Sequence, residues 1–499
     1  MTSLTFAKSP KSLVKGSRTL LVLAPASAFR PRKLPSLLDS AKQKLLLGLA
    51  RDASPGDQGT LVSTRLTGSP RRLFAGVLPD KVSRYNAPSR AEAIRRLVSS
   101  ADFDDKGKVA IALVLDDPSH LLPAANAVAR AFPKFSRKAG APDYQVELLA
   151  VDSHGDVIAP SDVVLATIEA TRDSAELVDT PPTELNPEAY AKRIRELLKG
   201  LPRVKIREIE GAKLLSEKLV GIHSVGRAAV NAPRMVIAQY SPARGDAAGK
   251  RRHFALVGKG VTFDTGGLNL KISGSMRSMK CDMGGSAAVL GAFRVLVQGG
   301  FEHDLTLIMC LAENAIDANS YKPDDILTVH SGKTVEINNT DAEGRLLLID
   351  GVSYAARVLG ADTIIDAATL TGAQMIATGQ MHAVIVSNDG AAEAELVAAG
   401  TTSGDLCHPL PFAPEFYKSE FESVVADMCN SVHNRMNAQT ACAAQFVYWH
   451  LEGTDVRWCH IDLAGPAFRK NRGTGYGVAL ISQGVRNLAA LDATEQAAD

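Results

Sequence analysis

The chain has 499 residues, more than one hydrophobic core usually organises, so two domains are expected. Hydrophobic residues make up 45% of the sequence, which is enough to build both cores. A net charge of only +2 excludes a strong electrostatic argument for nucleic acid or a membrane surface as the main partner. No apolar run approaches the roughly 20 residues of a membrane span. The six cysteines form no C-x-x-C pair, which favours a reducing compartment.

The first 38 residues are basic, with seven lysines and arginines and no acidic residue before Asp39. A signal peptide or an organelle presequence has this composition, so a mitochondrial address is one alternative. The other is that Leu20–Ala24 forms the first strand of an amino-terminal domain and Leu34–Arg51 its first helix. We favour the strand, because the next periodic segment follows without a spacer, and we expect a cytoplasmic protein.

Apolar, β-branched runs alternate with helical patterns along the chain, which predicts an α/β fold. Prolines between Asp179 and Pro187 interrupt both patterns, and Asn186 is a suitable cap for a helix that starts at Pro187. We therefore expect one domain at residues 1–180 and a larger one at residues 181–499. The larger domain is predicted to contain five buried strands, at Met235–Gln239, Phe254–Val257, Leu305–Cys310, Thr363–Ala368 and Ala383–Ser387.

The octapeptide at residues 339–346 follows an apolar run and contains two carboxylates, a glycine and an arginine. If the backbone stays extended, the i, i+2 spacing aims Asp341 and Glu343 at one point, and Gly344 allows a sharp turn afterwards. Converging carboxylates suit a divalent metal ion. An exposed acidic turn that caps a helix beginning at Arg345 explains the same residues equally well.

A second cluster lies at residues 258–285 and contains Lys259, Asp264, Lys271 and Asp282 among glycines and apolar residues. Phosphate-loop and dinucleotide-binding patterns fail there, because the required glycines and the Ser/Thr are absent. Unpaired charges would be costly in such surroundings. Together with the octapeptide the cluster supplies four carboxylates, which two divalent cations would balance in a hydrolytic site.

At these residues the chain resembles the leucine aminopeptidase family, the two-metal cytosol aminopeptidases, and most closely its probable aminopeptidase-like branch. The resemblance covers residue 180 to the carboxyl end, and residues 1 to about 150 match weakly. It implies a smaller amino-terminal α/β domain, with an oligomer-forming or regulatory role, and a catalytic α/β domain with a mainly parallel mixed central sheet flanked by helices. The motifs that carry it are residues 257–267 with Lys271, 279–285, 339–346, 366–372 and 460–465.

The resemblance implies metallo-aminopeptidase activity on peptides with a free amino terminus. It implies two divalent cations, Mn²⁺ and/or Zn²⁺, and a metal-bridging water as nucleophile. Lys271 would stabilise the oxyanion, Arg345 would hold a bicarbonate that serves as general base, and Lys259 would have to be neutral to bind metal. The implied metal ligands are Lys259, Asp264, Asp282, Asp341 and Glu343, and the implied substrate pocket is Met279, Asn339, Thr369, Gly372, Ala464 and Ala467.

The family also implies a homohexamer built from two trimers. The sequence itself predicts no membrane partner, and its low net charge argues against nucleic acid as the main partner. Two alternative functions stay open at this point. One is a DNA-binding accessory protein, which the basic amino-terminal segment allows. The other is a catalytically silent scaffold of the same family, although the full set of predicted ligands argues against such decay.

Overall fold

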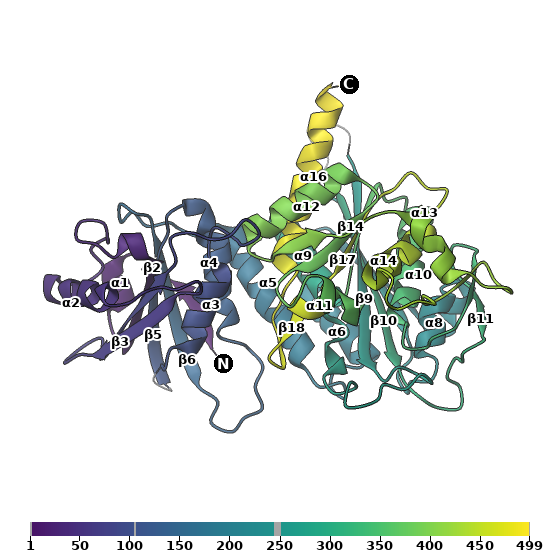
Figure 1. Ribbon diagram of the computed structural model, residues 1–499, viewed down its shortest axis with the longest axis horizontal. Helices are drawn as coiled ribbons and strands as arrows, with labels where there is room; N and C mark the ends of the chain where they lie inside the picture. Colours follow the sequence, from purple (N-terminus) through teal and green to yellow (C-terminus); the bar gives the residue numbers. More distant parts are fainter. Residues whose placement is uncertain (1, 104–105, 244–250, 499) are drawn as a thin grey trace. The chain divides into compact units, whose positions relative to one another are not determined.

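The computed structural model describes residues 2–103, 106–243 and 251–498. These residues form two compact units, which are coloured from purple to blue and from teal to yellow in Figure 1. The amino-terminal unit comprises Met1–Arg172 together with Gly400–Leu406, and the carboxyl-terminal unit comprises Asp173–Ala399 and Cys407–Asp499. A short segment from late in the sequence therefore belongs to the first unit.

The amino-terminal unit contains a six-stranded sheet in the order β1-β6-β5-β2-β4-β3. All neighbouring strands are parallel except β3, which pairs antiparallel with β4 at the edge. Its strands are β1 (Ser3–Phe6), β2 (Thr19–Pro25), β3 (Thr60–Arg65), β4 (Arg72–Leu78), β5 (Lys106–Val114) and β6 (Asp143–Val151). Its helices are α1 (Pro10–Val14), η1 (Ala26–Ala28), α2 (Ser40–Arg51), α3 (Ala91–Ser100), η2 (Pro118–His120) and α4 (Leu121–Arg130), and α5 (Asp162–Asp179) continues into the second unit.

The predicted strand at Leu20–Ala24 is confirmed, because it lies in β2, whose residues are all buried. It is not the first strand, however, since β1 and α1 precede it. The predicted start of the first helix at Leu34 was also wrong. The helix begins at Ser40, where the side chain of Asp39 accepts a hydrogen bond from the Lys42 amide and caps the first turn.

The carboxyl-terminal unit contains an eight-stranded mixed sheet in the order β15-β14-β17-β13-β9-β10-β8-β7. The central run of β17, β13, β9 and β10 is parallel. All five predicted strands are present in this sheet, and the mixed, mainly parallel α/β architecture is confirmed. Its strands are β7 (Val204–Glu210), β8 (Arg234–Tyr240), β9 (His253–Asp264), β10 (Asp304–Asn314), β13 (Thr363–Ala368), β14 (Ala383–Ser387), β15 (Cys407–Pro409) and β17 (Arg457–Asp462).

Helices cover both faces of the eight-stranded sheet (Figure 1). One face packs against α6 (Pro187–Leu198), α9 (Gly284–Gln298), α12 (Gly390–Ser403) and α16 (Val478–Ala498). The other packs against α7 (Lys213–Ser216), α8 (Val220–Gly226), α10 (Gly344–Arg357) and α14 (Gln439–Trp449). The remaining elements of the unit are η3 (Met279–Cys281), β11 (Ile326–Thr328), β12 (Thr334–Glu336), α11 (Gly372–Ala377), α13 (Pro414–Tyr417), η4 (Lys418–Phe421), β16 (Met428–Cys429), α15 (Ala464–Ala467), β18 (Phe468–Arg469) and β19 (Arg472–Gly473).

The helix predicted from Pro187 is confirmed as α6, and Asn186 caps it by accepting a hydrogen bond from the Ala189 amide. Across the described ranges, no helix combines the length and apolarity that crossing a membrane would require.

Four parallel strands set the position of the functional residues. Their carboxyl ends lie at one edge of the sheet, with Asp264 ending β9, Asn314 ending β10, Ala368 ending β13 and Asp462 ending β17. In open α/β sheets this edge is where ligands bind. The motifs singled out in the sequence follow these strand ends.

Candidate functional site

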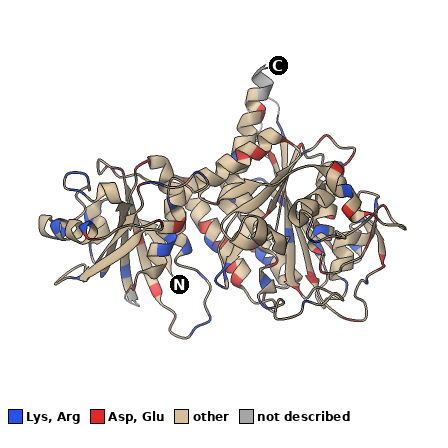
Figure 2. Cartoon of the chain, in the orientation of Figure 1, with Lys and Arg blue, Asp and Glu red and all other residues tan. Residues whose placement is uncertain are grey.

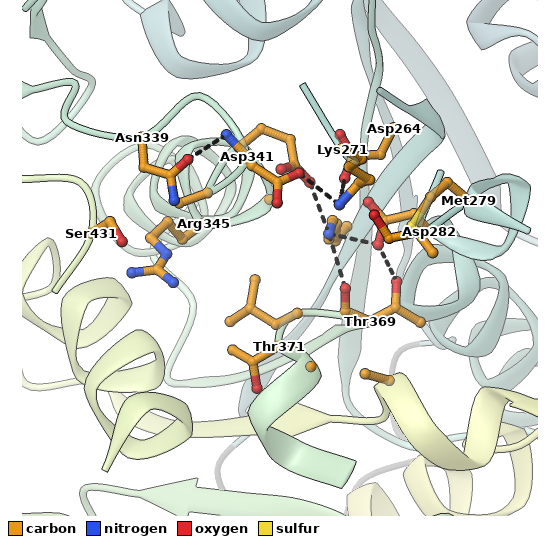
Figure 3. A pocket seen from close by; sticks show the side chains of 18 of the residues that line it. Asp264, Lys271, Met279, Asp282, Asn339, Asp341, Arg345, Thr369, Thr371 and Ser431 are labelled. Carbon is orange, nitrogen blue, oxygen red and sulfur yellow. Dashed lines mark hydrogen bonds and ion pairs between the residues drawn. The ribbon is translucent and has the colours of Figure 1, made fainter. Parts of the chain in front are cut away.

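A cavity of about 310 Å³ opens at the carboxyl ends of β9, β13 and β17. Every predicted site residue except Ala467 lines it. Figure 3 shows the labelled side chains converging on this space, with Asp264, Asp282 and Met279 on one side and Asn339, Arg345 and Ser431 on the other. The fold thus brings together residues that are far apart in the sequence.

Lys259 lies in β9 and is only 2% exposed. Its Nζ atom donates hydrogen bonds to Asp282 Oδ1 at 2.7 Å and to the Thr369 carbonyl at 2.9 Å, and lies 3.0 Å from Glu343 Oε1. Burial lowers the pKa of Lys259, but the neighbouring carboxylates outweigh burial and raise it. In this arrangement Lys259 is an ammonium ion, so the neutral state that metal ligation demands depends on a bound cation.

Lys271 follows β9 and reaches back to the carboxylates. Its Nζ atom lies 2.7 Å from Asp264 Oδ2 and 2.6 Å from Asp341 Oδ1. The other Asp264 oxygen accepts hydrogen bonds at 2.8 Å from the Gly266 amide and from Asn314 Nδ2. Burial lowers the pKa of Lys271, but the neighbouring carboxylates raise it by more than burial lowers it. This lysine therefore stays protonated at neutral pH.

The donor set fits divalent cations. One carboxylate oxygen from each of Asp264, Asp341 and Glu343 lies within 4.8 Å of the others. Burial, helped by neighbouring carboxylates, raises the pKa of Asp264, Asp282 and Asp341. With Glu343 the cluster has four carboxylates but only the two ammonium groups of Lys259 and Lys271 beside them. Among the described residues, the buried Asp282 Oδ2 also has no hydrogen-bond partner. Hard oxygen donors with surplus negative charge are what divalent cations require.

The octapeptide reaches this cluster by a different route from the one expected. Its backbone is not extended: the Ala342 amide donates to the Asn339 carbonyl in a turn, and the Asp341 amide donates to Asn339 Oδ1. Glu343 already has helical backbone angles, φ −74° and ψ −36°, directly before α10. The premise of an extended backbone was therefore wrong, because an asparagine side chain stabilises a turn there. The turn brings the two carboxylates together nevertheless.

Gly344 was expected to turn the chain sharply, and this too was wrong. It is the first residue of α10, and its φ lies outside the left-handed region. What requires glycine is space, since a Cβ atom at Gly344 would lie 2.4 Å from Lys259 Cε and 2.6 Å from Nζ. The missing side chain lets Lys259 lie against the first turn of α10.

Arg345 is buried in the wall of the cavity, 4% exposed. Its Nη1 atom donates to the Asn430 carbonyl at 3.0 Å, and its guanidinium lies over the Phe446 ring. The buried Nε atom has no hydrogen-bond partner among the described residues. Burial lowers the pKa of Arg345 to about 10, so it still carries its charge at neutral pH. An unpaired guanidinium nitrogen of this kind fits a small oxyanion.

Asn430 positions both the turn of the octapeptide and the side chain of Arg345, and the sequence analysis did not identify it. Its Oδ1 atom accepts from the amides of Asn338 and Asn339, and its Nδ2 atom donates to the Asn339 and Ala342 carbonyls. The same residue binds Arg345 through its backbone. It lies far from the octapeptide in the sequence, and no local pattern marks it.

Five of the six predicted pocket residues line the cavity: Met279, Asn339, Thr369, Gly372 and Ala464. Ala467 does not. It is buried beside them, where a Cβ atom on Gly284 would lie 3.1 Å from both Ala467 Cβ and Thr369 Cγ2. Its contact with substrate stays a prediction. The lining residues that the sequence analysis missed include Ser275, Leu370, Thr371, Met375, Ser431, Arg435 and Gln439.

Asp462 positions two of the lining segments. Its buried carboxylate accepts hydrogen bonds from the Leu370 and Thr371 amides, the Thr371 hydroxyl and the Ala464 amide. It therefore joins the loop after β13 to the turn after β17. Asp462 belongs to the motif at residues 460–465, but that motif alone assigned it no role.

Converging carboxylates, two lysines paired with them and an arginine with an unpaired nitrogen, at the carboxyl edge of a mixed α/β sheet, define the class of the protein as a metallohydrolase. The family model described as Cytosol aminopeptidase family, catalytic domain, matches residues 173–482. A second model, M17 aminopeptidase N-terminal domain 2, matches residues 58–141. The chain belongs to the cytosol aminopeptidase family and is a metallo-aminopeptidase.

Individual relatives agree with this assignment. The chain is 44% identical over 416 residues to a probable aminopeptidase, NPEPL1, of Mus musculus, covering 81% of this chain and 77% of that protein. A structure of Caenorhabditis elegans leucine aminopeptidase superposes with a TM-score of 0.87 at 33% identity, covering 97% of this chain and 99% of that chain. The bottromycin maturation enzyme BotP, solved in complex with Mn, superposes with a TM-score of 0.77 at 26% identity, covering 95% and 99%.

Proposed function

We propose that the protein is a leucyl-type aminopeptidase that uses two divalent cations to remove the amino-terminal residue of peptides. The observation that carries the proposal is the convergence of Asp264, Asp341 and Glu343 within 4.8 Å, with the buried Lys259 and the half-buried Lys271 beside them. Asp264 and Glu343 would bridge both cations, Asp341 would complete one site, and Lys259 with Asp282 the other. The manganese in the BotP structure supports Mn²⁺ as one candidate, beside Zn²⁺.

Each catalytic group has a task that its position supports. Bound cations supply a Lewis acid for the scissile carbonyl and lower the pKa of a water molecule. Lys271, held protonated by its carboxylate neighbours, stabilises the oxyanion that develops on that carbonyl. Arg345 offers its unpaired Nε to a bicarbonate ion, which would supply the general base.

The predicted pocket suits an unbranched or leucine-like side chain, because small and apolar groups line it. Met279 lies on the Asp282 side of the cavity (Figure 3). Thr369 is tied to Asp282 by a hydrogen bond of 2.8 Å, so the pocket wall and the metal-ligand set form one unit.

Hydrolysis of aminoacyl chromogenic amides, with Mn²⁺, Zn²⁺ or Co²⁺ added and with a chelator as control, tests the proposal. We expect metal-dependent turnover that is greatest for leucine-like residues. If no amino acid is released under any metal condition, the chain is a silent scaffold of the family and the proposed activity is wrong.

Substitution of Gly344 by alanine is expected to weaken cation binding. The new Cβ atom would overlap the Lys259 side chain, which must then leave its place between Asp282 and Glu343. We expect cation affinity to fall about 10- to 100-fold, as it does when residues that support a metal site are lost. Calorimetric metal titration measures the change.

Gly390→Ala is the matched control. Gly390 also opens a helix, α12, but a Cβ atom there meets no atom within 4 Å. Its cation affinity should equal that of the wild type. Equal affinities in both variants would show that Lys259 needs no space at Gly344.

The expected assembly is a homohexamer of two trimers, and the family's description as cytosol aminopeptidases supports a cytoplasmic location. Light scattering that gives a monomeric mass would contradict the assembly. Imaging of a fusion tagged at the carboxyl end, with and without the first 18 residues, tests the mitochondrial alternative.

DNA binding is the second candidate. Lys and Arg outnumber Asp and Glu in residues 1–172, although Figure 2 shows both kinds of charge on the elements of each unit. A phosphate-binding surface would weaken steeply with salt. A gel-shift experiment without binding at low salt removes this candidate.

A further inference from the structure

One cationic side chain of the cavity has no task in the proposed reaction. Arg435 lines the cavity but lies in an exposed loop, between β16 and α14. Its guanidinium makes no hydrogen bond or ion pair with any residue that the structure describes. The ion pairs of the cavity's carboxylates are made with Lys259 and Lys271 instead. Arg435 is therefore free to bind an anionic group of a ligand.

The loop that carries Arg435 is held in place by Glu420. The Glu420 carboxylate accepts hydrogen bonds from the Asn434 amide at 2.9 Å and from Asn437 Nδ2 at 2.8 Å, and its backbone carbonyl accepts from the His433 amide. The Asn437 hydrogen bond is the main reason why the pKa of Glu420 is lowered. These hydrogen bonds fix the residues on either side of Arg435. Little backbone conformational entropy is therefore lost when Arg435 binds a ligand in the cavity.

The position of Arg435 relative to the reacting groups decides which anion it meets. Met279 and Ser431 lie on opposite sides of the cavity (Figure 3), and Arg435 belongs to the same loop as Ser431, between β16 and α14. If the amino-terminal side chain of a substrate occupies the Met279 side and its carbonyl lies by Lys271, the rest of the peptide extends toward Ser431. In a peptide of two or three residues, the free carboxylate then comes to this side.

We propose that Arg435 binds the free α-carboxylate of very short peptides and so directs the enzyme toward dipeptides and tripeptides. This inference rests on the proposed function. A volume of about 310 Å³ lies at the lower end of small-ligand cavities, which suits such substrates. Gln439, the first residue of α14, also lines the cavity, and the helix has no side-chain cap, so its partial positive charge adds to that of Arg435.

The test compares Leu-Leu with its carboxyl-terminal amide, Leu-Leu-NH₂, as substrates of the metal-loaded full-length enzyme. The measured quantity is the ratio of kcat/KM for the acid to kcat/KM for the amide, which cancels changes in folding or metal content. We expect Arg435→Gln to lower this ratio about 5-fold relative to the wild type, the size of a partly exposed ion pair. Arg435→Glu should lower it further, because the charge then repels the carboxylate.

Met436→Gln is the matched control, since Met436 is the next residue, is 91% exposed and does not line the cavity. Its ratio should equal that of the wild type. An unchanged ratio in both Arg435 variants would overturn the inference while the aminopeptidase activity stands. If the wild type hydrolyses neither peptide nor a leucyl chromogenic amide, the proposed function itself fails.

Discussion

Substitution of Asp264 by alanine is expected to remove both cations and nearly all activity. Asp264 ends β9 at the centre of the carboxylate cluster, and its oxygens lie in reach of those of Asp341 and Glu343. Because it is proposed to bridge the two cations, its loss should weaken both sites together. Lewis-acid catalysis is worth several kcal/mol, so we expect kcat/KM to fall by roughly 10³-fold or more.

Metal analysis after gel filtration is the direct measurement. Asp264→Asn serves as a second variant, because it keeps the shape of the side chain and an oxygen that can accept from Gly266 or Asn314, but lacks the charge. Both variants should elute as the wild type does and contain less metal. Retention of two ions by the alanine variant would refute the bridging role.

Glu313→Ala provides the control for this experiment. Glu313 precedes Asn314 in β10, is half-buried, and has a pKa that burial raises, yet it does not line the cavity. Glu313 lies at the register shift between Ala312 and Asn314 and is not itself paired with β9, so its side chain can be removed while Asn314 stays opposite Asp264. We expect the variant to keep both cations.

Five of the eight strands of the carboxyl-terminal sheet could be predicted, because they are largely buried and read as apolar runs. The first elements of the amino-terminal unit could not be predicted, because β1 and α1 are too short to show a periodic pattern of apolar residues. The start of α2 depended on one capping contact, from Asp39, which an apolar pattern extending from Leu34 concealed.

The octapeptide shows what local sequence can and cannot tell. The octapeptide does form a turn before a helix, but the interpretation as an exposed, helix-capping acidic turn is wrong, because Glu343 is buried and its side chain makes no capping hydrogen bond. Asp341 and Glu343 instead belong to the carboxylate cluster. The turn depends on Asn430, which makes four hydrogen bonds to three residues of the 338–342 segment from another part of the chain. Long-range hydrogen bonds of this kind leave no periodic signal in either segment.

The role of Gly344 was misjudged for a related reason. A glycine beside acidic residues suggests a backbone requirement, because glycine is the residue that turns tolerate best. Here its backbone is ordinary, and the requirement comes from the side chain of Lys259 on the neighbouring strand. Only the packing of α10 against β9 reveals it.

Substitution of Lys271 is expected to slow catalysis while the cations stay bound. This substitution distinguishes two possible roles of Lys271, charge balance and oxyanion stabilisation. In the structure its ammonium forms ion pairs with Asp264 at 2.7 Å and with Asp341 at 2.6 Å, so one explanation is that it serves only to balance charge. In that case its removal would leave kcat near the wild-type value once cations are supplied, because cations would balance the same carboxylates.

If Lys271 instead stabilises the oxyanion, Lys271→Ala should lower kcat about 10²- to 10³-fold with metal content unchanged, as loss of an oxyanion donor does. Lys271→Met, which keeps the length of the side chain, should behave alike, because a thioether cannot replace the charge. Lys333→Met is the control, since Lys333 also forms an ion pair, with Glu452 at 2.7 Å, but does not line the cavity. A full complement of cations combined with a normal kcat in Lys271→Met would assign Lys271 to charge balance alone.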